Sequence, residues 1–121
     1  MINFKRLGNS FVYAWKGLIY ALKNEQNFRI FIVLGAIVLV LMFVFDLARY
    51  ERIFLLILVF SILILELVNT VFENLVDFIE PKMNEKVGVI KDMVATIVLL
   101  ASITAAIIGL WIFVPHIIAL F

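Results

Sequence analysis

Residues 53–77 read IFLLILVFSILILELVNTVFENLVD. The first thirteen of them are apolar except for Ser61, and polar residues recur at intervals through the other twelve. About 20 helical residues cross a bilayer core, and an open strand edge in hydrocarbon would leave backbone groups unpaired. This stretch therefore predicts a transmembrane helix, and with it a helical membrane protein.

Two further apolar stretches, at 30–45 and 93–114, predict two more spans. Across the chain 66% of residues are hydrophobic and 16% are charged, against roughly 25% charged in an average soluble domain. A soluble domain of this size could not bury so much apolar surface. The net charge of +1 excludes a nucleic-acid binder held by phosphate charge. The absence of cysteine excludes a thiolate metal site.

The first 27 residues predict an amphipathic helix at the membrane surface. Their apolar side chains recur every three or four residues, and basic residues lie between them. This pattern is typical of a helix in the lipid headgroup layer. The apolar positions are Phe4, Leu7, Phe11, Trp15, Leu18 and Leu22.

The sequence as a whole predicts an all-α integral membrane protein with a single domain over residues 1–121. We expect a surface helix region at 1–27 and transmembrane helices at 28–46, 52–77 and 92–115. Five Lys and Arg precede the apolar stretch at 30–45, two lie in 46–52, three lie in 77–92 and none follows 114. Cytoplasmic segments carry the excess of basic residues. The eight-to-two division predicts a cytoplasmic N-terminus, a cytoplasmic 77–92 loop and a C-terminus outside.

Polar residues in the second span share one helical face, since their spacing follows the helical repeat. A carboxylate in the bilayer costs about 2.5–3.5 kcal/mol on insertion scales, so these residues are candidates for a functional site. Hydrogen bonding between helices and a proton path are the alternatives, and for Asp77 the alternative is a helix cap or an ion pair with Lys82. The face consists of Glu66, Asn69, Thr70, Glu73 and Asp77.

The predicted topology brings further charged residues to the cytoplasmic side, namely Glu25, Lys91 and Asp92. Carboxylate oxygens with no histidine or cysteine nearby suit Mg²⁺, which also binds phosphate oxygens. A lysine beside them suits a polyphosphate. No GxxxxGK[ST] loop is present, so the helices themselves are expected to hold a magnesium nucleotide.

The stretch 66–77 followed by Lys91-Asp92 resembles the signature of the small bacterial membrane lipid kinases, the prokaryotic diacylglycerol kinase and undecaprenol kinase family. Residues 11–18 and 25–29 are similar to the surface helix of the same family. The resemblance implies a homotrimer in a bacterial cell membrane that phosphorylates a lipid alcohol with MgATP. It also implies active sites shared between protomers.

The resemblance also implies roles for individual residues. Glu66 is the expected catalytic base, and Glu25 and Glu73 are the expected Mg²⁺ ligands. Lipid contacts are expected from Arg6, Trp15 and Glu66. The expected ATP-binding residues are Arg6, Tyr13, Glu25, Asn69, Glu73, Lys91 and Asp92. The chain departs from the family pattern at Asn84, where a histidine is common, and at 94–97, where smaller residues are usual.

The substrate implied by the resemblance is undecaprenol in preference to diacylglycerol. The stretches that favour it are 77–81, 27–29 and 109–115. A diacylglycerol kinase is the alternative within the family. A non-catalytic membrane adaptor and an ion or proton conductor using the polar face are the alternatives outside it.

Overall fold

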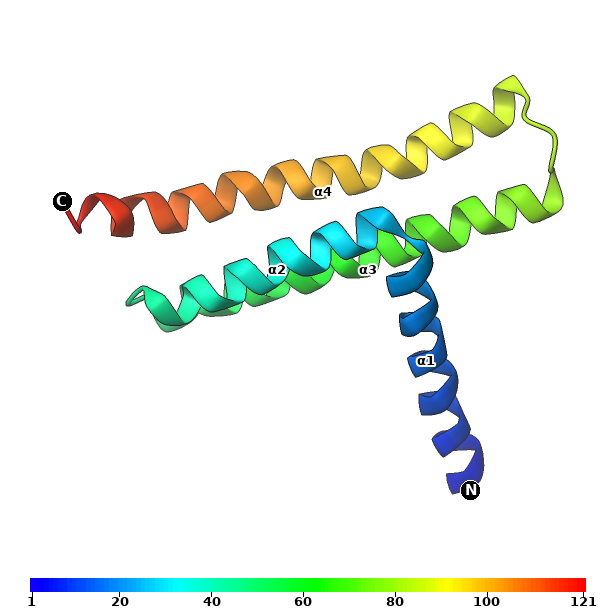
Figure 1. The fold of residues 1–121 in the computed structure, drawn as a ribbon, viewed down its shortest axis with the longest axis horizontal. Coiled ribbons are helices and arrows are strands. Elements are labelled where there is room, and N and C mark those ends of the chain that lie inside the picture. The colour runs from blue at the N-terminus through cyan, green and yellow to red at the C-terminus, as the bar shows by residue number, and fades with distance from the viewer.

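The computed structural model describes all of residues 1–121 and contains four α-helices and no strands (Figure 1). They are α1 (Phe4–Asn24), α2 (Gln26–Val44), α3 (Arg49–Ile79) and α4 (Glu85–Ile118). α2, α3 and α4 run side by side, and α1 projects sideways from the start of α2, while α3 and α4 extend past that point to the loop between them (Figure 1). The predicted class, an all-α membrane protein with a separate N-terminal helix and three spans, is confirmed.

α2, α3 and α4 are each long and apolar enough to cross a membrane. Two of them extend well beyond their apolar stretches. α3 begins at Arg49 and ends at Ile79, and α4 begins at Glu85, so the connection between them covers only residues 80–84. The expectation of a loop over 77–92 is wrong, because these helices continue as hydrogen-bonded helix after their apolar residues end.

Side-chain caps set the start of each long helix. At the start of α4, the Oδ1 atom of Asn84 accepts a hydrogen bond from the Val87 N–H at 2.9 Å. At the start of α3, the Ala48 N–H donates to Glu51 Oε1 at 2.9 Å. Such caps satisfy backbone groups that a helix end leaves unpaired. Asn84 therefore has a structural role here, which explains an asparagine at this position.

α1 is separated from α2 by one residue, Glu25, which has an extended backbone with φ −113° and ψ 107°. The surface helix thus ends at Asn24. On α1 the side chains of Phe11 and Trp15 are 71% and 64% exposed. A helix with an exposed apolar face is suited to lie in the membrane surface.

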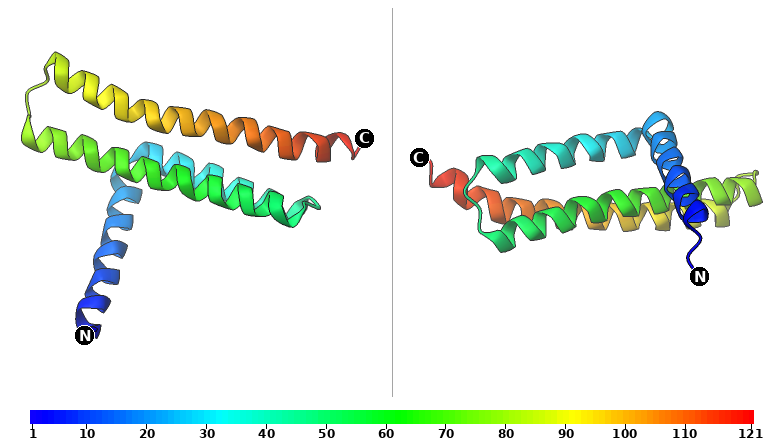
Figure 2. Two further views of the ribbon diagram at one scale, coloured as in Figure 1. Left: turned by 180° about the vertical axis from the view of Figure 1, so that it is seen from behind. Right: turned by 90° about the horizontal axis from the view of Figure 1, so that it is seen from below.

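α3 is the central helix of the bundle and contacts both α2 and α4. The views in Figure 2 show α2 and α4 on different sides of α3. At the end of the bundle far from α1, Met42, Leu47, Leu55 and Ile112 form a small buried cluster. The rings of Phe45 and Phe113 pack beside it with centroids 5.8 Å apart.

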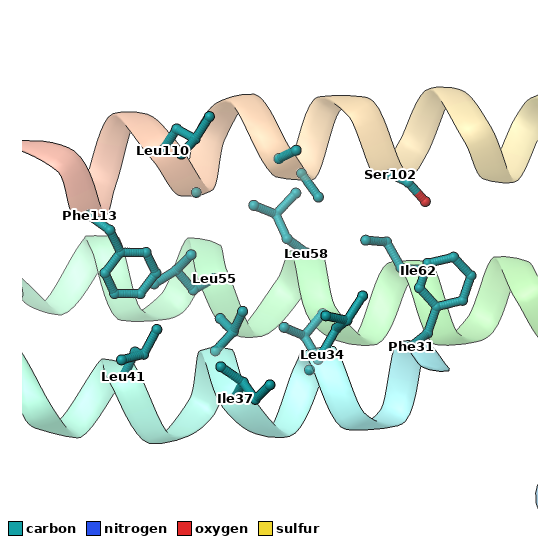
Figure 3. Close-up of a pocket in the computed structure, with 16 residues that line it drawn as sticks. Phe31, Leu34, Ile37, Leu41, Leu55, Leu58, Ile62, Ser102, Leu110 and Phe113 are labelled. Carbon is teal, nitrogen blue, oxygen red and sulfur yellow. The ribbon is translucent and has the colours of Figure 1, made fainter. Parts of the chain in front are cut away.

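An apolar cavity of about 460 Å³ lies between the three spans. Figure 3 shows Leu41, Leu55 and Phe113 at one end of it and Phe31, Ile62 and Ser102 at the other. Gly35 of α2 also lines this cavity. A Cβ atom at Gly35 would lie 2.8 Å from Val59 Cγ1 of α3, so the glycine permits the close approach of these helices.

We expect Gly35→Ala to lower the free energy of unfolding by about 1–3 kcal/mol, the usual cost of overpacking. The reason is that the valine side chain is stiff at χ1 and cannot easily move away from a new methyl group. Thermal unfolding in detergent micelles measures the change. Gly109→Ala is the matched control, because nothing lies within 4 Å of a Cβ built there. Equal losses in the two variants would contradict the close approach, and the pair Gly35→Ala/Val59→Ala should recover part of the loss.

Candidate functional site

Three neighbouring polar side chains of α3 are buried in a chain whose surface is mostly apolar. Glu66 is 3% exposed, and Asn69 and Thr70 are each 6% exposed. The helical repeat places them within one turn of one another. They lie on the part of α3 toward α1 and the 80–84 loop, beyond Ile62 and its end of the apolar cavity.

Two further carboxylates lie close enough to Glu66 for their charges to interact with it, those of Glu73 and Glu25. Glu73 follows on α3, and the Asn69 Nδ2 atom donates a hydrogen bond of 3.4 Å to its Oε1 atom. Glu25 comes from the break between α1 and α2. The fold therefore brings Glu25, from a separate part of the sequence, toward Glu66 of α3.

Two buried polar atoms of this group have no hydrogen-bond partner in the chain, namely Asn69 Oδ1 and Thr70 Oγ1. A buried polar group left unpaired costs about 1–3 kcal/mol. The hydroxyl of Thr70 also does not bond back to its own helix, although Ser102 and Thr104 of α4 do so. Both atoms are therefore available to a molecule that binds beside Glu66.

The ion pair of the site connects α3 to α4. Lys91 Nζ binds Asp77 Oδ1, with the lysine side chain 22% exposed and the aspartate 58% exposed. The pairing of Asp77 with Lys82 is thus wrong. Asp77 also does not cap α3, because the helix continues to Ile79 and its C-cap is Glu80. Antiparallel packing of α3 and α4 brings Lys91, rather than a loop residue, next to Asp77.

Asp92 follows Lys91 on α4 and is exposed. Its backbone carbonyl accepts a hydrogen bond from Thr96 Oγ1 at 2.8 Å. Its carboxylate makes no hydrogen bond or ion pair within the chain. The side chain is therefore unpaired on the surface of α4, one residue after Lys91.

The predicted site residues of α1 are not close to Glu66 of the same chain. Arg6 lies 19 residues before Glu25, which is roughly 28 Å along a helix at 1.5 Å per residue, and α1 leads away from the bundle (Figure 1). Tyr13 and Trp15 are exposed at 67% and 64%. The Lys16 Nζ atom lies 5.9 Å from the centroid of the Tyr13 ring.

The sequence predicted no role for Arg29 beyond its basic charge and its place in the stretch 25–29. Its Nη1 atom donates hydrogen bonds to the carbonyls of Leu22 and Lys23 at the end of α1. The signal was present in the sequence as a basic residue in the first turn after a helix break, but only the backbone path shows what it contacts.

The carboxylates present suit a magnesium ion that arrives with a nucleotide. No group of three or more Asp, Glu, His or Cys side chains in the chain could hold a metal ion. Mg²⁺ in nucleotide sites is held by one or two carboxylates, with waters and phosphate oxygens filling the other positions. Glu25 and Glu73 supply that number, so their chemistry fits this type of site.

Comparisons with known proteins agree on one family. The family model described as prokaryotic diacylglycerol kinase matches residues 12–113. A diacylglycerol kinase of Synechocystis is 36% identical over 115 residues, covering 92% of this chain and 64% of that protein. An undecaprenol kinase of Bacillus subtilis is 33% identical, covering 91% of this chain and 89% of that protein. A diacylglycerol kinase of Escherichia coli is 35% identical, covering 86% and 85% respectively.

We expect Asp77→Asn to lower the free energy of unfolding by less than about 1 kcal/mol, because exposed ion pairs contribute little. Unfolding in micelles, with Lys91→Met and the double variant, completes a mutant cycle for this pair. A coupling of several kcal/mol would contradict the exposed position of the Asp77 side chain. Asp46→Asn, which alters an exposed aspartate at the other end of the bundle, is the control.

Proposed function

This chain belongs to the prokaryotic diacylglycerol kinase family, a family of membrane lipid kinases, and from that premise we propose that it transfers the γ-phosphoryl group of MgATP to the hydroxyl of a membrane lipid alcohol. The observation that carries the proposal is the buried carboxylate of Glu66 on an apolar helix, with Glu25 and Glu73 beside it. Because a carboxylate is costly to place in a membrane, a glutamate at such a position is by default a candidate functional residue.

Glu66 is the general base in this proposal. Its carboxylate accepts the proton of the lipid hydroxyl as the hydroxyl oxygen forms a bond to the γ-phosphorus. The bond between the γ-phosphorus and the bridging oxygen breaks, and that oxygen leaves with ADP. The apolar residues that precede Glu66 on α3 keep water away from the base. They also leave the site open to a substrate that arrives from the bilayer.

The other polar residues align and neutralise the phosphates, which is most of what phosphoryl transfer requires. Glu25 and Glu73 would hold Mg²⁺, which would supply positive charge to neutralise the phosphate oxygens. Lys91 turns from Asp77 toward the phosphates. Asn69 and Asp92 line the nucleotide, and the unpaired Asn69 Oδ1 atom accepts a hydrogen bond there.

We propose a homotrimer in which α1 of one protomer completes the site of a neighbour. Support comes from the positions of Arg6, Tyr13 and Trp15, which are exposed on α1 and lie far from Glu66 of their own chain. In a neighbour's site Arg6 and Tyr13 contact ATP, and Arg6 and Trp15 contact the lipid. The number of protomers rests on the family resemblance.

The proposed setting is the bacterial cell membrane, with a cytoplasmic N-terminus and a C-terminus outside. Its support is the eight-to-two division of Lys and Arg, and the nucleotide then reaches Glu25, Glu73 and Lys91 from the cytoplasm. Residues 1–121 act as a single kinase domain. The proposed substrate is undecaprenol, and diacylglycerol is the alternative, because relatives with either name match this chain at similar identity.

We expect Glu66→Gln to reduce kcat by at least about 100-fold, since general bases contribute typically 10²–10⁴-fold. Glutamine keeps the shape of the side chain but cannot accept the proton. The measurement is transfer of labelled phosphate from MgATP to lipid in mixed micelles. Glu80→Gln, which makes the same change on an exposed residue outside the site, should leave the rate unchanged.

Undecaprenol and diacylglycerol are compared side by side in the same assay. A higher kcat/KM with undecaprenol supports the proposed substrate, and a higher value with diacylglycerol replaces it by the alternative. Activity on neither lipid, with Glu66→Gln indistinguishable from the unaltered protein, would contradict the kinase proposal. Nucleotide-independent proton flux in liposomes would then favour the conductor alternative.

Glu73→Gln is expected to raise the Mg²⁺ concentration needed for half-maximal activity by at least about tenfold, the low end for residues that support metal ligands. The loss of one charged ligand weakens the ion's hold while leaving the lipid groove intact. A Mg²⁺ titration at saturating ATP measures the shift, and the KM for lipid serves as the internal control. An unchanged Mg²⁺ dependence would remove Glu73 from the metal site.

A further inference from the structure

The break between α1 and α2 is crossed by one arginine. Arg29 lies in the first turn of α2, and its Nη1 atom donates to the carbonyls of Leu22 at 2.9 Å and Lys23 at 3.0 Å. Neither carbonyl accepts a backbone N–H. These are the unpaired carbonyls at the C-terminal end of α1, where the helix dipole favours a positive charge.

The same residue closes the break through its backbone. The Arg29 N–H donates to the Glu25 carbonyl at 3.2 Å, and the Glu25 N–H donates to the Ala21 carbonyl at 2.9 Å. Glu25 is thus held between two helices by bonds on both of its sides. Ala21 before the break and Phe28 after it are 3% and 1% exposed, so both sides of the break are anchored by burial.

Within the chain, and apart from the burial of Ala21, little else fixes the direction of α1. α2 is the helix with which α1 makes most of its contacts, and α1 has no ion pair to the bundle. Arg29 makes no ion pair either, so its charge is directed to the α1 carbonyls alone. The angle of α1 to the bundle therefore depends on the backbone at Glu25 and on the Arg29 side chain.

We infer that Arg29 is a positioning residue that fixes the angle between α1 and α2 and thereby holds the Glu25 carboxylate within range of the Glu66 carboxylate. The effect on Glu25 as a metal ligand rests on the proposed function, whereas the effect on the angle does not. Arg29 touches no reacting group in this role. It acts through the end of α1 and through Glu25.

The test measures the angle directly. The chain has no cysteine, so Gly8→Cys on α1 and Gly88→Cys on α4 give a single pair of spin labels at positions with open space around them. Labelled chains are diluted with unlabelled chains in lipid nanodiscs, and pulsed electron paramagnetic resonance gives the distance distribution. The variants are Arg29→Met, which has similar length and no donor, and Arg29→Lys, which keeps a charged donor. Arg49→Gln, at an exposed arginine with no side-chain hydrogen bond, is the control.

We expect a narrow distribution with Arg29, a broad or displaced one with Arg29→Met, and recovery with Arg29→Lys. Arg49→Gln should leave the distribution unchanged. Equal distributions for the unaltered protein and Arg29→Met would overturn the inference, since the Arg29 side chain would then not fix the angle between α1 and α2.

The second readout is the Mg²⁺ dependence of phosphoryl transfer. Arg29→Met is expected to raise the Mg²⁺ concentration for half-maximal activity several-fold while the KM for lipid stays the same. A broadened distance distribution with unchanged Mg²⁺ dependence overturns the effect on Glu25. If the unaltered protein transfers no phosphate at all, the proposed function fails, and the distance distributions still decide the role of Arg29 at the break.

Discussion

A charged carboxylate in hydrocarbon is the constraint on which the rest of this protein depends. Backbone groups in a bilayer have no water to bond, so the chain crosses as helices whose hydrogen bonds are internal. The backbone bonds of a helix do not satisfy the charge of a carboxylate side chain, which needs protein, ligand or water around it. Glu66 is 3% exposed and forms no ion pair within the chain, so it depends on burial in the bundle and on what binds beside it.

One end of the bundle is packed with apolar side chains, and the buried polar residues lie toward the other end. The end far from α1 is apolar, with Met42, Leu47, Leu55 and Ile112 packed together and the rings of Phe45 and Phe113 beside them. The other end carries Glu66, Asn69 and Thr70 in its interior. α3 runs through both as a continuous helix, so packing at the apolar end holds the polar residues in place. Stability and chemistry therefore do not compete for the same residues.

Much of the fold was predictable because hydrophobic length and helical periodicity are local properties. The three spans and the separate N-terminal helix follow from them directly. The helix ends did not follow, because the 80–84 loop depends on the Asn84 cap, and the break at Glu25 lies in a stretch without proline or glycine. Glu66, Asn69 and Glu73 could be assigned to one face from spacing alone, since they lie on one helix. Their relation to Glu25 and Lys91 required the packing of different helices.

The sequence by itself determined that this is a three-span membrane protein with a surface helix and one polar face on its second span. It did so because bilayer thickness and the 3.6-residue repeat leave few other solutions. The tertiary structure decided that Asp77 pairs with Lys91 instead of Lys82, that Glu25 joins Glu66, and that Arg29 binds the end of α1. Each of these contacts joins two helices or crosses a break in the chain. Their geometry comes from packing and backbone direction, which no local pattern encodes.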